Sequence, residues 1–176
     1  MEIPGIVRVI EPTGPMGPLV VDVPHAGRTY PTDFRYSCPY PLLRQAEDAY
    51  VDELVAGAAS HGVPVVAALF PRSMIDVNRA LDDLDPALVD GVWPEPLQPT
   101  ERTLQGLGLI RRMCRGGVPM YDAPLSLADE LPRLAAQNRL LYAEQRGRLA
   151  ATPFPPAPAR LRVMGAMTMR LGSVSG

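Results

Sequence analysis

The sequence predicts an α/β fold with a parallel sheet, on three observations. Residues 19–23 form a short, mostly β-branched apolar run between two prolines, as expected of a strand buried on both faces. Residues 42–61 carry apolar side chains at helical spacing, and Gly62 follows as a C-cap. A second run of strand type covers residues 63–70. Strand, helix and strand in this order predict a βαβ unit with two adjacent parallel strands.

Three further segments have recognisable patterns. Residues 6–10 alternate between apolar and other side chains, which predicts another short strand. Residues 86–99 are rich in proline, and a loop of this length often forms the wall of a site. Residues 125–149 regain helical spacing, with Ser126 as the expected N-cap.

Composition limits the classes of function. A length of 176 residues suits one domain, expected over residues 1–150, with an irregular tail over 151–176. A net charge of -2 gives no general attraction to nucleic acid or to an anionic membrane. The sequence shows neither a long apolar span nor a signal peptide, so we expect a cytoplasmic protein. Cys38 and Cys114 lack metal-binding spacing and are expected to be free thiols. The oligomeric state does not follow from the sequence.

His25 follows the first predicted strand closely, after Pro24. Ligands of α/β sheets bind beyond the carboxyl ends of the strands, and an imidazole there can hold a metal or transfer a proton. A loop histidine held by ordinary hydrogen bonds is the alternative. The position alone leaves both interpretations open.

A second cluster of chemically active side chains follows the second predicted strand. Asp76 and Asn78 would share one face if this segment were extended. Arg79 could bind a carboxylate bidentately, with Asn78 as a neutral donor and Arg72 as a second positive charge. A structural Asp–Arg pair with the asparagine in a turn is equally compatible with the spacing.

Five motifs along the chain together resemble those of the N-formylglutamate amidohydrolase family, in order and approximate spacing. They cover residues 21–27, 47–54, 72–79, 106–110 and 117–126. The resemblance extends over roughly residues 15–130. It implies a metal-dependent amidohydrolase, related to the zinc carboxypeptidase and aspartoacylase group. It also implies a three-layer α/β/α sandwich around a mostly parallel sheet.

The resemblance implies a metal site. His25 and Asp48 would be ligands of a divalent metal, with zinc as the first candidate. Asp48 and Asp52 are four residues apart and would share a helix face, so that Asp52 or Glu47 could support the ligands, as could Asp76. Zinc bound in this way with an open position lowers the pKa of bound water and polarises a scissile carbonyl.

The resemblance also implies a substrate. Arg79 and Asn78, with Arg72 nearby, would bind the carboxylate of an acidic N-acyl amino acid, and N-formyl-L-glutamate would be hydrolysed to formate and L-glutamate. A deacylase or desuccinylase acting on another acidic N-acyl amino acid is a weaker alternative. No nucleic acid or membrane partner is expected.

The sequence departs from the family pattern after about Gln137. Members carry two further histidine-containing segments that are not found here, so the fold is expected to be truncated. The only other histidine, His61, is expected to cap helix carbonyls. Because a catalytic zinc site typically has three protein ligands, we expect weak zinc binding and little hydrolysis. The alternative to an active enzyme is therefore an incomplete member that binds acidic small molecules.

Overall fold

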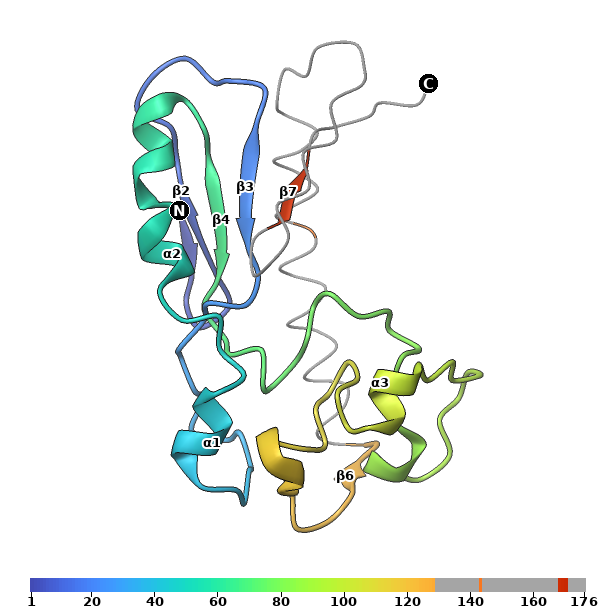
Figure 1. The fold of residues 1–176 in the computed structure, drawn as a ribbon. Helices are drawn as coiled ribbons and strands as arrows, with labels where there is room; N and C mark the ends of the chain where they lie inside the picture. The colour runs from blue at the N-terminus through green and yellow to red at the C-terminus, as the bar shows by residue number, and fades with distance from the viewer. Residues whose placement is uncertain (129–142, 144–167, 171–176) are drawn as a thin grey trace. The chain divides into compact units, whose positions relative to one another are not determined.

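The computed structural model describes residues 1–128, 143 and 168–170 (Figure 1). The chain divides into two compact units. The first comprises Met1–Gly27, Asp48–Leu69 and Leu140–Gly176, and the second comprises Arg28–Glu47 and Phe70–Arg139. The predicted domain bounds, 1–150 and 151–176, stay a prediction. The helix expected over 125–149 lies largely outside the described residues.

The first unit is built on a five-stranded sheet with the order β1-β2-β4-β3-β7. The strands are β1 Glu2–Ile3, β2 Val7–Ile10, β3 Val20–Val23, β4 Val65–Ala68 and β7 Thr168–Arg170. β3 and β4 pair in parallel, which confirms the prediction of two adjacent parallel strands. The pairs β1–β2, β2–β4 and β3–β7 are antiparallel, so the sheet is mixed in the part that the structure describes.

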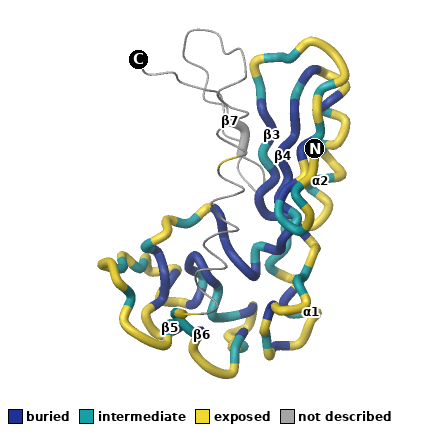
Figure 2. The backbone as a smooth tube through the Cα atoms, turned by 180° about the vertical axis from the view of Figure 1, so that it is seen from behind, coloured by how far each residue is buried: buried dark blue, intermediate teal, exposed yellow. Residues whose placement is uncertain are grey.

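The two central strands supply the core of this unit. All four residues of β4 are buried, and β3 is buried except for the half-buried Asp22. Branched side chains favour extended backbone and pack well on a pleated surface, which explains why these short runs form strands. Figure 2 shows β3 and β4 as buried backbone, whereas the neighbouring helical segment is largely exposed or intermediate. The described residues contain both strands and helices, with the helical pieces α2 and η1 between the parallel strands β3 and β4, and the predicted α/β class is confirmed.

The prediction of one continuous helix over residues 42–61 is wrong. The segment forms three short pieces, α1 Tyr40–Arg44, α2 Val51–Leu54 and a 3-10 helix, η1, Ala56–His61. The backbone N–H of Asp48 donates to the carbonyl oxygen of His25 at 3.0 Å instead of to a helical carbonyl. Tyr50 adopts a left-handed conformation, with φ of 67°.

The apolar periodicity of residues 42–61 does not reflect one helix, because its side chains pack into two different cores. Leu43 is fully buried and belongs to the second unit, whereas Val51 and Val55 pack against the cluster around β3 and β4 in the first. A helical spacing that continues across a unit boundary therefore does not require a continuous helix. Gly62 ends η1 with φ of 77°, as predicted for a C-cap.

The second unit consists mainly of turns and short elements. Besides α1 these are η2 Pro86–Leu88, β5 Val89–Asp90, α3 Glu101–Leu104, η3 Arg115–Gly117 and β6 Leu125–Ser126. β5 and β6 pair in parallel. Ser126 lies in this strand, and most of the helix that it was predicted to cap lies outside the described residues, so that role stays a prediction. Fully buried side chains form the core: Phe70, Met74, Ile75 and Leu84. Among the described residues, no helix has the length and apolar character needed to cross a membrane.

Candidate functional site

His25 and Asp48 form a close pair within the first unit. His25 lies two residues beyond the end of β3, with only 5% of its surface exposed. Its Nδ1 atom lies 3.2 Å from Oδ2 of Asp48. The hydrogen bond from the N–H of Asp48 to the carbonyl oxygen of His25 fixes the two backbones beside each other. The break in the predicted helix is therefore what places Asp48 next to the histidine.

This pair provides ligand atoms that suit zinc. Bonds of about 2.0–2.2 Å at a tetrahedral angle would separate a nitrogen and an oxygen ligand by roughly 3.3–3.5 Å. The observed 3.2 Å between His25 and Asp48 is close to this separation and equally suits a hydrogen bond. Within the part of the chain that the structure describes, no group of three or more His, Cys, Asp or Glu side chains could hold a metal ion.

Asp52 and Glu47 do not stand on a common helix with Asp48. Asp48 precedes the helical segment, and Asp52 lies in the first turn of α2, so the predicted shared helix face is wrong. Glu47 belongs to the second unit, where the hydroxyl of Tyr30 donates to its Oε1 at 2.6 Å and Arg44 contacts Oε2 at 3.1 Å. Burial, followed by the hydrogen bond to Glu47, raises the pKa of Tyr30, so the tyrosine remains a donor. A supporting role for Asp52 or Glu47 at a metal stays a prediction.

Asp76 is the centre of an arginine cluster in the second unit. Its buried carboxylate accepts a hydrogen bond from Nε of Arg72 at 2.9 Å. Arg79 and Arg111 each place a guanidinium nitrogen 3.9 Å from the same oxygen, Oδ2. The side chains of these arginines are between 16% and 20% exposed. One carboxylate therefore holds the three guanidinium groups together.

The backbone around Asp76 forms a turn and not the extended segment considered above. The other carboxylate oxygen of Asp76, Oδ1, accepts the backbone N–H of Asn78 at 3.1 Å, and the N–H of Arg79 donates to the carbonyl oxygen of Asp76 at 3.0 Å. Aspartate favours such turns because its short side chain replaces a backbone acceptor. As a result Asp76 is buried and Asn78 is exposed, so the two side chains do not share a face.

Arg79 makes a second contact in this cluster, with Oδ2 of Asp83 at 3.6 Å. Burial acts to raise the pKa of Asp83, but hydrogen bonds from the side chain of Thr103 and from Thr100, together with the charge of Arg79, lower it overall. Asp83 is thus held as a carboxylate. It orients Arg79 through a contact longer than the roughly 2.7–2.9 Å of a strong charge-assisted hydrogen bond.

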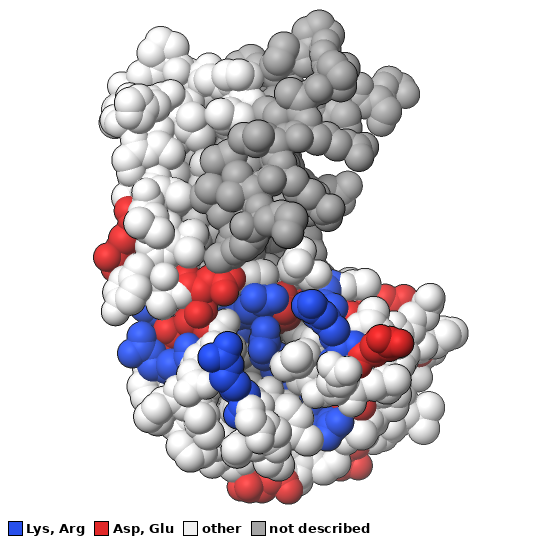
Figure 3. Space-filling model, in the orientation of Figure 1, with Lys and Arg blue, Asp and Glu red and all other residues white. Residues whose placement is uncertain are grey.

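Sequence reasoning missed Arg111. Arg111 and Arg112 are adjacent in the sequence, but Arg111 approaches Asp76, whereas Arg112 donates to Asp85 at 2.7 Å. The signal that could have identified them is the basic pair directly after the glycine-containing motif at 106–110. The sequence contains no lysine, so all side chains coloured blue in Figure 3 are arginines, and they gather with carboxylates on the face shown.

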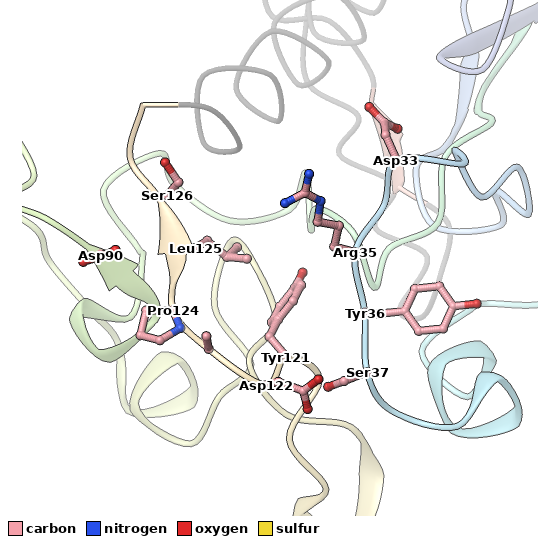
Figure 4. A pocket seen from close by; sticks show the side chains of 11 residues that line it. Asp33, Arg35, Tyr36, Ser37, Asp90, Tyr121, Asp122, Pro124, Leu125 and Ser126 are labelled. Carbon is pink, nitrogen blue, oxygen red and sulfur yellow. The ribbon is translucent and has the colours of Figure 1, made fainter.

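A cavity of about 580 Å³ lies within the second unit. Its walls come from Asp33, from residues 35–37 and 121–126, and from Asp90 at the end of β5 (Figure 4). The proline-rich segment 86–99, which begins with η2 and β5, thus contributes one residue to a cavity wall. Arg72, Asn78 and Arg79 do not belong to this lining.

Comparison with known proteins identifies the family. The family model described as N-formylglutamate amidohydrolase matches residues 17–149. A solved structure of N-formylglutamate amidohydrolase from Ralstonia eutropha JMP134 is similar, with 38% sequence identity and a TM-score of 0.79. The alignment covers 84% of this chain and 52% of that one, so this chain spans about half of its length. None of the curated proteins compared with the sequence matches it. The resemblance inferred from the motifs is confirmed, and the chain belongs to the N-formylglutamate amidohydrolase family.

Proposed function

We propose that this chain takes part in the metal-dependent hydrolysis of an acidic N-acyl amino acid, with N-formyl-L-glutamate as the first candidate substrate. The observation that carries the proposal is the 3.2 Å approach of His25 to Asp48, just beyond a buried strand. Family membership supports the same reaction class. The similar solved structure is an N-formylglutamate amidohydrolase, which makes its substrate the first one to test.

His25 and Asp48 would hold the metal. Zinc is the first candidate because imidazole nitrogen and carboxylate oxygen are both common zinc ligands. When bound, such an ion polarises a carbonyl group and lowers the pKa of a coordinated water. The chain itself positions the two ligands, because the backbone hydrogen bond between Asp48 and His25 holds their side chains at one place. Burial of His25 limits the orientations of its ring.

Arg79 is the best candidate to bind the substrate carboxylate. Its contacts with Asp76 and Asp83, at 3.9 and 3.6 Å, hold the guanidinium in place but are too long to be strong hydrogen bonds. Its donors therefore suit a carboxylate that approaches more closely. Arg72 is bound to Asp76 at 2.9 Å, so it adds positive charge and fixes Asp76, while the exposed Asn78 offers a neutral donor.

A second candidate function is the binding of acidic small molecules without turnover. The pair of His25 and Asp48 supplies two ligands, and a catalytic zinc site typically has three protein ligands and one water. A two-ligand site would bind zinc more weakly. The arginine cluster around Asp76 does not depend on the metal ligands for its internal contacts, so carboxylate binding could persist without hydrolysis.

Formate release from N-formyl-L-glutamate in the presence of added zinc distinguishes these functions. For an active chain we expect His25→Ala to lower the rate by at least about 100-fold. His61→Ala is the matched control, because it removes the only other histidine, which lies exposed at the end of η1. Equal rates in the wild type and in His25→Ala would contradict the proposed metal site. Binding of the substrate without formate release would favour the second candidate.

The acyl and side-chain specificity can be tested with the same assay. N-formyl-L-leucine lacks the second carboxylate, and N-succinyl-L-glutamate changes the acyl group.

Arg79→Ala should raise KM for N-formyl-L-glutamate by about 10- to 100-fold, since a charge-assisted hydrogen bond contributes roughly 1.5–3 kcal/mol. Arg102→Ala, at an exposed position in α3, is the control. An unchanged KM in Arg79→Ala would remove Arg79 from the substrate site.

A further inference from the structure

Two cysteines that are distant in the sequence meet in the second unit. Cys38 and Cys114 are separated by 76 positions, yet their Sγ atoms lie 3.2 Å apart. Both side chains are buried, and the residues are 5% and 7% exposed. A disulfide bond is about 2.05 Å long, so the sulfur atoms would need to approach by roughly 1.2 Å. Both cysteines lie outside helices and strands.

Backbone hydrogen bonds hold the two segments together beside the sulfur atoms. The N–H of Ser37 donates to the carbonyl oxygen of Met120 at 2.9 Å, and the Ser37 hydroxyl donates to the same oxygen at 3.2 Å. The N–H of Cys114 donates to the carbonyl oxygen of Val118 at 2.8 Å, and the N–H of Met120 donates to the carbonyl oxygen of Arg112 at 2.8 Å, so the segments before and after this turn are held together. The approach of the cysteines therefore depends on the packing of two segments and not on one side-chain rotamer.

We propose that Cys38 and Cys114 are a redox modification site, at which a small-molecule disulfide such as oxidised glutathione drives formation of an intramolecular disulfide bond. One cysteine, as the thiolate, attacks a sulfur of oxidised glutathione, whose S–S bond breaks and releases one glutathione as its thiolate, which takes up a proton. The second cysteine then attacks the protein sulfur of the mixed disulfide and releases the second glutathione. Two protein thiols are oxidised by two electrons in total, and one glutathione disulfide is reduced to two thiols.

The reduced pair is a stable starting state. Burial, followed by the hydrogen bond to Cys38, raises the pKa of the Cys114 thiol to about 12. Cys114 is therefore protonated at neutral pH and donates to Cys38. A protonated thiol is a poor nucleophile, so the exchange is expected to be slow under native conditions.

Oxidation would affect the cavity in this unit. Ser37 and Tyr121 both line its wall (Figure 4). Ser37 directly precedes Cys38, and Tyr121 directly follows Met120, whose carbonyl oxygen accepts the hydrogen bonds from Ser37. A covalent link beside these hydrogen bonds would hold the walls formed by 33–37 and 121–126 at a fixed separation. The modification is independent of the proposed hydrolysis, because neither cysteine belongs to the proposed metal or carboxylate sites.

The experiment incubates the reduced, purified chain with oxidised glutathione under native conditions, followed by acid quenching, alkylation and mass spectrometry. We expect a monomer lighter by about 2 Da that no longer alkylates, since each thiol loses one hydrogen. A proteolytic digest should contain one linked pair of peptides, carrying Cys38 and Cys114. The midpoint of thermal unfolding should rise by about 5–15 °C and return to its original value with dithiothreitol.

Single and double variants provide the controls. Neither Cys38→Ser nor Cys114→Ser should lose about 2 Da, because no intramolecular disulfide can form. The variant that keeps the attacking cysteine should accumulate the mixed disulfide with glutathione, because no second thiol resolves it. The double variant should have the same unfolding midpoint with and without oxidant. Two persistently alkylatable cysteines in the wild type, a stable adduct with glutathione, or a disulfide between two chains would each overturn the proposal. Because the primary measurement uses the wild-type chain, it does not depend on the folding of any variant.

Discussion

The two candidate binding regions are constructed in different ways. His25 and Asp48 depend on a strand, since β3 delivers the histidine and one backbone hydrogen bond brings the aspartate to it. The arginine cluster depends on side chains, since Asp76 gathers Arg72, Arg79 and Arg111 around a turn. The difference teaches that Asp76 holds its neighbours together through its side chain, whereas Asp48 is placed beside His25 by a backbone hydrogen bond.

The largest expected effect tests this contrast directly. Asp76→Ala should lower the free energy of unfolding by about 3–5 kcal/mol, because it removes a buried carboxylate that three partly buried guanidinium groups contact. Asp48→Ala, at a side chain that is 23% exposed, should cost only about 1 kcal/mol. Denaturation by urea measures both values. A similar loss for the two variants would show that Asp48 is as structural as Asp76.

A smaller loss of stability is expected on replacing Gly62, the residue that caps the C-terminal end of η1. Gly62→Ala should lower the free energy of unfolding by about 2 kcal/mol, because its φ is 77° and an added Cβ would clash with the backbone oxygen of Pro15. Gly57→Ala is the matched control in the same 3-10 helix, where no atom lies within 4 Å of an added Cβ. It should be neutral or stabilise by about 0.4–1 kcal/mol. Equal effects of the two variants would contradict the left-handed cap.

The dependence of stability on pH tests the second unit. The pKa of Asp83 is lowered from its ordinary value of 3.8 when the chain is folded. The folded state then binds this proton more weakly than the unfolded state, so the contribution of Asp83 to stability is present above about pH 4. It is lost as the pH falls through the lower, folded value. Urea denaturation between neutral pH and pH 2 should show that the free energy of unfolding falls less steeply with pH in Asp83→Asn than in the wild type. The same dependence on pH in both chains would contradict the assignment.

The smallest effect is expected at Tyr30, at the alkaline end. Its pKa is raised above the ordinary value of 10.0, chiefly by burial. The contribution of Tyr30 to stability is therefore complete below about pH 10 and decreases as the pH rises further. Ultraviolet titration of the folded wild type and of folded Tyr30→Phe should give the same absorbance change near pH 10, because Tyr30 ionises only at higher pH. A smaller change in Tyr30→Phe would show that Tyr30 ionises near its ordinary pKa and would contradict the assignment.

Much of the first unit could be predicted from the sequence. The parallel strands follow from two short β-branched runs, and the strand at 7–10 follows from alternation. The helix over 42–61 could not be predicted correctly, because Leu43 and Val51 fit one helical period while packing into different units. The choice of Asp48 came from the family motif, and its position beside His25 arises from a backbone hydrogen bond that no periodicity records.

The second unit was less predictable for a physical reason. Turn segments are stabilised by side-chain hydrogen bonds between distant residues, such as Asp83 with Thr100 and Thr103, and such pairs leave no regular spacing. Asp76 and Arg79 were found because they lie close together in the sequence. Arg111 was missed because it reaches Asp76 from a separate motif. The contact between Cys38 and Cys114 could not be predicted for the same reason, because the two residues are 76 positions apart in the sequence.

The central claim is that His25 and Asp48 are ligands of a metal ion, and calorimetric titration of the metal-free chain with zinc tests it most directly. We expect one zinc ion per chain in the wild type and in His61→Ala, with affinity reduced at least about 10-fold in His25→Ala and in Asp48→Asn. Binding should also release protons, because the ligands must be deprotonated. Unchanged affinity in both His25→Ala and Asp48→Asn, or no zinc binding by the wild type, would contradict the account.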